Sequence, residues 1–234
     1  MNLRSKAVLE AAIKEYIKSG EPVSSKGLAK VCDFGVKDAT IRAELNNLTK
    51  EGYLTQLHTS GGRMPTDKGY QFFVDSAIDD AMDSKRILSG RSGSLATKLK
   101  NGKIQDFVRE FSDVTHLLGV GTSQKEHQVY KSGLDDLFDR LDLEMKEDFQ
   151  EIIRDFEMLD NRFEDLVNKA FKQLDRPQVF IGKRSPITKS ENLSVIVDSY
   201  DINGEKVLIA IIGPKRMDYD RNLKLFKLFH EYDE

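Results

Sequence analysis

The chain has 234 residues, of which 32% are charged and 9% aromatic, and its formal net charge is −3. This length and mixture are typical of one or two globular domains and exclude a disordered chain. The longest apolar run, Val207–Ile212, is far shorter than a membrane span, and the first twenty residues lack a signal-peptide core. The single cysteine, Cys32, excludes an internal disulfide and a cysteine-cluster zinc site. We therefore expect a cytoplasmic protein without contact to a membrane.

The charges are divided unevenly along the chain. Residues 1–76 carry 11 Lys and Arg against 9 Asp and Glu, which gives +2, and the remainder carries 25 against 30, which gives −5. A basic front on an acidic body is expected if the front meets nucleic acid and the body does not. The difference is modest, so it supports that interpretation only together with motifs.

Three helices are predicted at the start of the chain. Residues 5–19 place apolar side chains at helical spacing, and Gly20 ends that helix. A short helix over residues 24–33 and a third over residues 37–52 follow, joined by a tight turn through Gly35. Two short helices joined by a glycine-containing turn are typical of a helix-turn-helix, which docks its second helix in the major groove of DNA.

A hairpin and a fourth helix complete this part of the chain. The alternating segment "YLTQLHT" (53–59) predicts a strand, and Gly61-Gly62 predicts a turn before Pro65. Thr66 is a candidate cap for the helix that follows. Three helices and a hairpin predict a winged helix-turn-helix DNA-binding domain over residues 1–76.

Residues 77–103 are basic, rich in small side chains and poorly periodic, so they predict a linker or a loosely packed helix. "IQDFVREF" predicts a helix, and "THLLGVG" and "HQVYKSG" predict two strands. We expect a second domain over residues 104–234.

A long amphipathic helix is predicted over Met145–Phe171. Its apolar stripe holds Phe149, Ile152, Ile153, Phe156, Leu159, Phe163, Leu166, Val167 and Phe171. The stripe is interpreted first as one face of the domain's own core, and second as the seam of a dimer.

The end of the chain predicts three strands and a closing helix. "QVFIG", "LSVIVDSY" and "KVLIAII" are strand-like, and the last two are joined by Asn203-Gly204, a strong hairpin signal. In the closing helix four side chains should face inward: Leu223, Phe226, Leu228 and Phe229. The fold class is therefore α+β, with an antiparallel sheet and flanking helices.

Candidate DNA contacts follow from the predicted helix-turn-helix and hairpin. Arginine pairs with guanine and asparagine with adenine, while hydroxyls, lysines and helix N-termini bind phosphates. The hairpin loop is expected to place two hydroxyls and a guanidinium on a phosphate backbone or in the minor groove. The candidates are Ser24, Ser25, Lys26, Lys37, Thr40, Arg42, Asn46, Asn47, Thr59, Ser60, Arg63 and Lys68. The plainer alternatives are a solvated helix face, simple helix capping by the serines, and an ordinary hairpin tip.

Signals for catalysis are weak. The four histidines are scattered without metal-ligand spacing, and "GVGTS" at 119–123 lacks the pattern of a phosphate-binding loop. Neither a serine nor the cysteine has the context of a nucleophile. We expect no enzyme, no catalytic or metal site and no cofactor.

Several segments carry a specific likeness. "GEPVSSKGLAK", "GVKDATIRAELNNLTKEGYL" and "HTSGGRMPTDKGYQFFVD" resemble the N-terminal domain of the HrcA family, the heat-inducible transcription repressors of bacteria. "VYKSGLDDLF", "VFIGKRSPI", "LSVIVDSY" and "IIGPKRMDYDRNLKL" resemble the middle and closing segments of that family.

The resemblance implies a winged helix followed by a reduced GAF-like domain for regulation and dimerisation. It implies a homodimer on double-stranded DNA with an inverted-repeat operator, which represses chaperone genes until heat stress. It also implies that a GroE-type chaperonin keeps the repressor active. The stretch from Asp113 to Asp148 leaves little room for the dimerisation element that the family inserts there, so we expect that element to be absent.

Three other functions stay open at this point. One is a winged-helix regulator controlled by a small-molecule ligand of the C-terminal domain. Another is an enzyme subunit whose winged helix contacts protein, and the third is a DNA binder without sequence preference.

Overall fold

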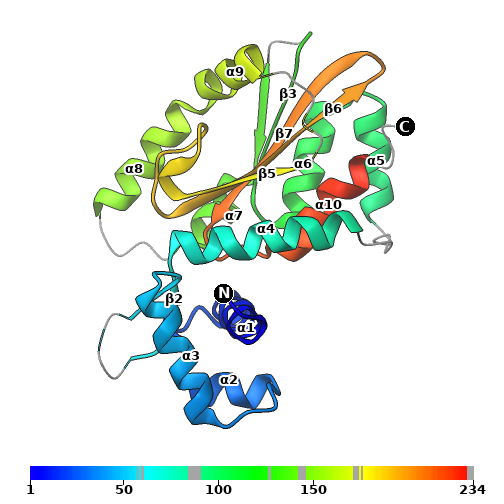
Figure 1. Ribbon diagram of the computed structural model, residues 1–234. Coiled ribbons are helices and arrows are strands. Elements are labelled where there is room, and N and C mark those ends of the chain that lie inside the picture. Colours follow the sequence, from blue (N-terminus) through cyan, green and yellow to red (C-terminus); the bar gives the residue numbers. More distant parts are fainter. Residues whose placement is uncertain are drawn as a thin grey trace. The chain divides into compact units, whose positions relative to one another are not determined.

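The computed structural model describes residues 1–56, 58, 61–83, 91–125, 128–141, 146–170, 174 and 176–230 (Figure 1). Its internal contacts divide the chain into two compact units, Met1–Ser76 and Ala77–Glu234. No helix in these described ranges is long and apolar enough to cross a membrane.

The first unit contains the predicted helices and hairpin. Its elements are α1 (Leu3–Ser19), α2 (Ser25–Val31), α3 (Asp38–Lys50), β1 (Leu54–Thr55), β2 (Met64–Pro65) and α4 (Asp67–Asp83), the last of which runs past the unit boundary. Asn2 caps α1 by accepting a hydrogen bond from the backbone N–H of Ser5, and Gly20 ends the helix in the left-handed conformation. The core is formed by apolar side chains from every helix: Val8, Leu9, Ile13, Leu28, Ile41, Leu45, Leu48, Leu54, Tyr70, Phe73 and Val74.

The second unit is built on a five-stranded sheet. Its elements are α5 (Arg91–Lys100), α6 (Ile104–Thr115), β3 (Leu118–Ser123), β4 (Val129–Ser132), α7 (Leu134–Asp139), α8 (Lys146–Glu157), α9 (Leu159–Ala170), β5 (Gln178–Ile181), a 3-10 turn (Gly182–Arg184), β6 (Leu193–Ile202), β7 (Glu205–Pro214) and α10 (Tyr219–His230). The strand order is β4-β3-β7-β6-β5, and all neighbours are antiparallel. Asn203 and Gly204 turn the β6–β7 hairpin with φ angles of 54° and 77°. The expected α+β class is confirmed.

Helices cover both faces of this sheet (Figure 1). On one face, side chains of β3, β6 and β7 pack with α7, α8 and α9 in a cluster that includes Val120, Val195 and Phe163. On the other face, α6 and α10 contribute a group of rings whose contacting pairs have centroids 5.1 to 6.4 Å apart: Phe107, Phe111, Phe226 and Phe229. The four predicted inward residues of α10 are all buried.

The glycines of "GVG" have a packing role. A Cβ on Gly121 would lie 2.6 Å from Cγ2 of Val108, and a Cβ on Gly119 would lie 3.0 Å from the carbonyl oxygen of the same residue. Because α6 crosses β3 this closely, the strand tolerates no side chain at these two positions. The motif serves helix-on-sheet packing.

Of the two alternatives for residues 77–103, a linker or a loosely packed helix, the described part shows helix. Residues 91–100 form α5, in which Leu95, Ala96 and Leu99 are buried. Lys98 and Ser94 both bind the Glu110 carboxylate of α6. Three small or apolar residues at helical spacing are enough to bury one face of a short helix.

The helix expected over Met145–Phe171 is two helices, α8 and α9, with Met158 between them. Ile152, Leu159 and Phe163 are buried in the cluster on the sheet, and Phe156 packs against it. The stripe is therefore the core face, as the first interpretation has it. The two ends of the predicted helix, Met145 and Phe171, lie outside the described residues.

Candidate nucleic-acid interface

The exposed side of α3 gathers the polar side chains that the sequence singles out. Ile41, Leu45 and Leu48 face the core and are at most 1% exposed. Helical geometry turns the intervening residues outward. Those exposed are Lys37, Ala39, Arg42, Ala43, Asn46, Asn47 and Lys50, and Thr40 is half-buried. The two alanines, which lie among these cations and amides, leave space for a binding partner to approach the helix closely.

Arg42 is held only loosely by its own helix. Its Nη2 lies 3.7 Å from Oδ2 of Asp38, one turn earlier, and its side chain is 58% exposed. An exposed pair of this spacing contributes about 0.3–0.5 kcal/mol. Arg42 can therefore leave Asp38 for a phosphate or a guanine at little cost.

The start of α2 offers less than expected. The Oγ of Ser24 caps the helix and accepts a hydrogen bond from the Gly27 backbone N–H at 3.1 Å. Ser25 is buried, because its side chain lies on the inner side of the first turn. Only Lys26 presents an exposed charge there. Capping explains Ser24, and burial argues against a DNA contact by Ser25.

Two glycines between β1 and β2, Gly61 and Gly62, make close backbone contacts. The N–H of Gly61 donates to the His58 carbonyl at 2.8 Å, which closes a turn. A Cβ on Gly62 would lie 2.3 Å from the carbonyl oxygen of Pro22, so only glycine fits there. Two candidate contacts, Thr59 and Ser60, lie outside the described residues.

Arg63 stands at the base of this loop. Its backbone makes a two-way bridge with Val23, with N···O distances of 2.9 and 2.8 Å. Its Nη2 donates to the Oδ1 of Asn46 on α3. Burial, and then the neighbouring Arg42 guanidinium, lower the pKa of Arg63. The structure thus brings Arg63, Asn46 and Arg42 together. One guanidinium nitrogen of Arg63 contacts Asn46 on α3, whereas the sequence predicts that Arg63 contacts a phosphate or the minor groove.

The segment after β2 is joined to the end of α3. Thr66 caps α4 by accepting from the Gly69 N–H, and its Oγ1 donates to the Gly52 carbonyl at 2.7 Å. Lys68 Nζ donates to the Glu51 carbonyl at 2.8 Å and lies 4.2 Å from the centroid of the Tyr53 ring. A cation at a helix C-terminus is favoured by the helix dipole. Lys68 therefore holds α4 to α3 in this structure.

Sequence reasoning missed two of the residues that shape this region. The sequence pattern predicted a turn at Gly62 and gave no role to Gly69. A Cβ on Gly69 would lie 2.2 Å from the Tyr53 carbonyl oxygen, so both glycines mark close backbone approach. A glycine in the first turn of a helix with good helix formers around it is the signal that could have indicated this.

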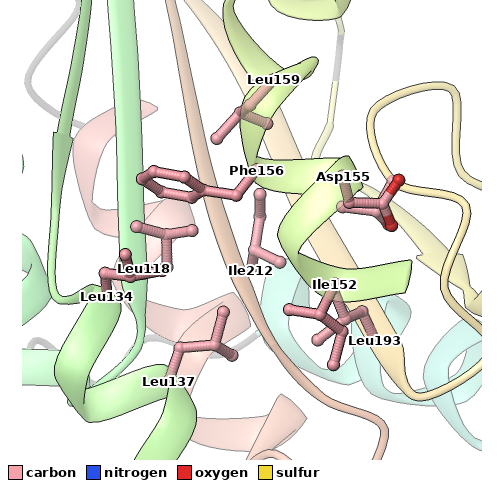
Figure 2. Close-up of a pocket in the computed structure, with 10 residues that line it drawn as sticks. Leu118, Leu134, Leu137, Ile152, Asp155, Phe156, Leu159, Leu193 and Ile212 are labelled. Atoms are coloured by element: carbon pink, nitrogen blue, oxygen red, sulfur yellow. The ribbon is translucent and has the colours of Figure 1, made fainter. Parts of the chain in front are cut away.

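The second unit contains a narrow apolar pocket between α7, α8 and the sheet (Figure 2). The space is small, with room for about one water molecule. Its lining residues are Leu118, Leu134, Leu137, Ile152, Asp155, Phe156, Leu159, Thr188, Leu193 and Ile212. Asp155 turns its carboxylate away from Phe156 in Figure 2. Its oxygens accept from Arg162 and from the backbone N–H groups of Lys189 and Ser190. The buried Oγ1 of Thr188 finds no hydrogen-bond partner in the described part of the chain.

Within the described ranges, no group of three or more His, Cys, Asp or Glu side chains could hold a metal ion. The polar features that the structure does assemble are therefore the exposed side of α3 with its loop, and the single hydroxyl of the apolar pocket.

Comparison with known proteins places these features in a family. The heat-inducible transcription repressor HrcA of Clostridium tetani is 39% identical over 137 residues, which cover 56% of this chain and 38% of that protein. The HrcA of Thermoanaerobacter sp. (strain X514) is 27% identical over 317 residues, covering 92% of this chain and 91% of that protein. Because 92% of 234 residues is about 215, about 100 of those 317 positions have no counterpart here.

A solved structure shares the fold. The crystal structure of a hypothetical protein superposes with a TM-score of 0.77 at 18% identity and covers 100% of this chain and 98% of that one. The family model described as the HrcA protein C terminal domain matches residues 74–223. This match spans more than half of the chain, and the chain belongs to the HrcA family.

Proposed function

We propose that the protein is a cytoplasmic transcription repressor of heat-shock genes, and that its first unit is a winged helix that binds duplex DNA. Its relatives are heat-inducible transcription repressors. The second unit is proposed to be a reduced GAF-like domain, which its antiparallel sheet with helices on both faces supports.

The observation that carries the proposal is the exposed side of α3. A helix whose three leucine and isoleucine residues are fully buried turns cations and amides outward around two alanines. Lysine and arginine supply phosphate contacts, and arginine and asparagine supply base contacts in the major groove. The residues proposed to touch DNA are Lys26, Lys37, Thr40, Arg42, Asn47 and the outward part of Asn46, with Thr59 and Ser60 as candidates on the loop.

The proposed mechanism uses two copies of the chain. Two α3 helices related by a two-fold axis would read the halves of an inverted repeat and block polymerase. Heat stress would release the repressor, and a GroE-type chaperonin would restore it. These last two steps come from the family likeness.

The test is a titration of the full chain, by fluorescence anisotropy at near-physiological salt, into two labelled duplexes. One duplex carries the inverted repeat of the family's operators, and the other carries the same bases scrambled. A preference of about a hundredfold or more for the repeat supports a sequence-specific repressor. Equal and salt-sensitive binding would leave a DNA binder without sequence preference, and absence of binding would refute the proposal.

A second candidate is a regulator controlled by a small ligand of the second unit. The observation that favours it is the buried Thr188 hydroxyl, which has no partner among the described residues. The pocket beside it has room for about one water molecule, so a larger ligand would have to displace the side chains that line it. A panel of small aliphatic and aromatic alcohols tests it. A saturable rise in melting temperature that is lost in Thr188→Val would support a ligand site, and no rise with any member would remove it.

A further inference from the structure

We infer that Arg63 is a positioning residue, which holds the Asn46 carboxamide in one orientation on α3 so that it reads a hydrogen-bond acceptor on a base edge. The inference rests on the proposed function. The sequence predicts that Arg63 contacts a phosphate or the minor groove. In this inference Arg63 instead affects which DNA sequence the protein prefers.

The backbone of Arg63 is fixed from two sides. Its N–H and C=O both bond to Val23, which is 4% exposed. The preceding Gly62 lies against the Pro22 carbonyl with no space for a side chain. The side chain of Arg63 therefore starts from a defined place beside α3.

The guanidinium determines which way Asn46 points. Arginine has only donors, so its partner on an asparagine must be the carboxamide oxygen. Exchanging the Asn46 oxygen and nitrogen would set N–H against N–H, so the contact that Arg63 makes with Oδ1 selects one orientation. The Nε of Arg63 is buried and unpaired among the described residues, which shows that this side chain packs against the protein surface.

Fixing the oxygen decides what Asn46 offers to DNA. With Oδ1 turned to Arg63, the Nδ2 hydrogens are the groups presented outward. In the major groove they match acceptors, namely N7 and O6 of guanine, N7 of adenine or O4 of thymine. A side chain that is ordered before binding also loses less conformational freedom when it binds.

A phosphate contact by Arg63 makes different predictions. Removing such a contact would weaken binding to the repeat and to the scrambled duplex equally. It would also lower the slope of log affinity against log salt concentration by about one. Lysine would largely replace arginine in that role, because a phosphate accepts a point charge. A positioning role needs the fixed reach and fork of the guanidinium, so lysine would fail.

The test compares Arg63→Lys, Arg63→Ala, Asn46→Ala and Arg63→Ala/Asn46→Ala on both duplexes. We expect each single variant to lose about tenfold of the preference for the repeat, with scrambled-duplex affinity unchanged in Arg63→Lys. The double variant should be no worse than Asn46→Ala, because the two residues act as one unit. Full preference in Arg63→Lys with equal weakening of both duplexes in Arg63→Ala would overturn the inference.

A measurement without DNA separates this inference from the proposed function. In the free full chain, NMR order parameters of the side-chain amides compare Asn46 with Asn47, an exposed neighbour for which the described structure gives no side-chain hydrogen bond. We expect Asn46 to be the more ordered and to fall to the level of Asn47 in Arg63→Lys. Equal mobility in the unmodified protein would refute positioning even if the repeat is bound, and a lack of preference for the repeat would refute DNA reading even if Asn46 is ordered.

Discussion

The two units use polar side chains at different depths. In the first unit, Arg63, Thr66 and Lys68 reach from the hairpin and α4 to α3 or its end, and all three are exposed or half-buried. In the second unit, Asp155 and Asp198 bind across elements while 3% and 0% exposed. These polar side-chain contacts between elements, which we call ties, therefore lie near solvent in the first unit, whereas the second unit has both partly exposed ties, such as Lys98 with Glu110, and fully buried ones.

This difference in burial determines how much each tie contributes to stability. A hydrogen bond near solvent contributes about 0.5–1.5 kcal/mol, so the ties of the first unit set positions more than they supply stability. A buried carboxylate loses its hydration on folding, and removing its partners or the group itself leaves buried polar atoms unsatisfied. Loss of a buried tie in the second unit should therefore lower its free energy of unfolding. Loss of a tie in the first unit should instead displace the hairpin relative to α3.

Asp155→Ala should have the largest effect. It leaves Arg162 and the backbone N–H groups of Lys189 and Ser190 without their acceptor, and Arg162 Nη1 lies 2.5 Å from Oδ1 of Asp155. We expect the free energy of unfolding in urea to fall by about 3–5 kcal/mol. Asp160→Ala is the matched control, because Asp160 is 50% exposed and its pair with Lys131 should contribute less than about 1 kcal/mol. Equal losses would contradict the contrast between depths.

Gly62→Ala should come next and should act on the loop. Its new Cβ would meet the Pro22 carbonyl at 2.3 Å, which forces the backbone apart. We expect a loss of about 1–3 kcal/mol in unfolding free energy and weaker binding to the inverted repeat.

Gly93→Ala is the control with the opposite sign. Gly93 lies in α5, and a Cβ there would meet nothing within 4 Å. The added methyl group should stabilise by about 0.5–1 kcal/mol and leave DNA binding unchanged. If Gly62→Ala changes neither the unfolding free energy nor the binding to the repeat, the backbone at Gly62 can shift without cost and does not position the loop.

The helices and strands of both units could be predicted from local patterns. The buried stripe of α3, the Asn203-Gly204 hairpin and the inward face of α10 are periodicity and turn chemistry, which depend on neighbours in the sequence. The break at Met158 was missed because the apolar spacing continues unchanged through it. The helix at 91–100 was predicted only as an alternative to a linker, because its buried face is only three residues long.

The candidate site was predictable as a surface and unpredictable as a set of contacts. Exposure of Arg42, Asn46 and Asn47 follows from the periodicity of α3. The engagement of Arg63 with Asn46, and of Lys68 with Glu51, depends on tertiary approach across 17 positions in each case. A sequence pattern shows that a cation is present, but the partner it selects is fixed only when the chain folds.

The buried Asp198 should make stability depend on pH. Burial raises the pKa of Asp198, although its Oδ2 lies 2.6 Å from Nε2 of His230 and Tyr200 lies close by. The folded state therefore holds this proton more tightly than the unfolded chain. The contribution is fully present below the unfolded pKa of about 3.9, and it is lost as pH rises through the raised pKa. Asp198→Asn should flatten that part of the curve of unfolding free energy against pH, and identical slopes would remove the effect.

Thr188→Val tests whether a buried polar group of the second unit lacks a partner. An unpartnered hydroxyl in an apolar lining costs stability, so replacing it by a methyl group of the same shape should stabilise by about 1 kcal/mol. Thr115→Val is the matched control, because the equally buried Thr115 Oγ1 donates to the Phe111 carbonyl at 2.8 Å, and its loss should cost about 1 kcal/mol. If both variants are destabilised, the Thr188 hydroxyl has a partner, and the polar groups inside the second unit are all ties. If only Thr188→Val is stabilised, the Thr188 hydroxyl is unsatisfied in the folded chain, and the second unit carries a buried polar group that serves no contact.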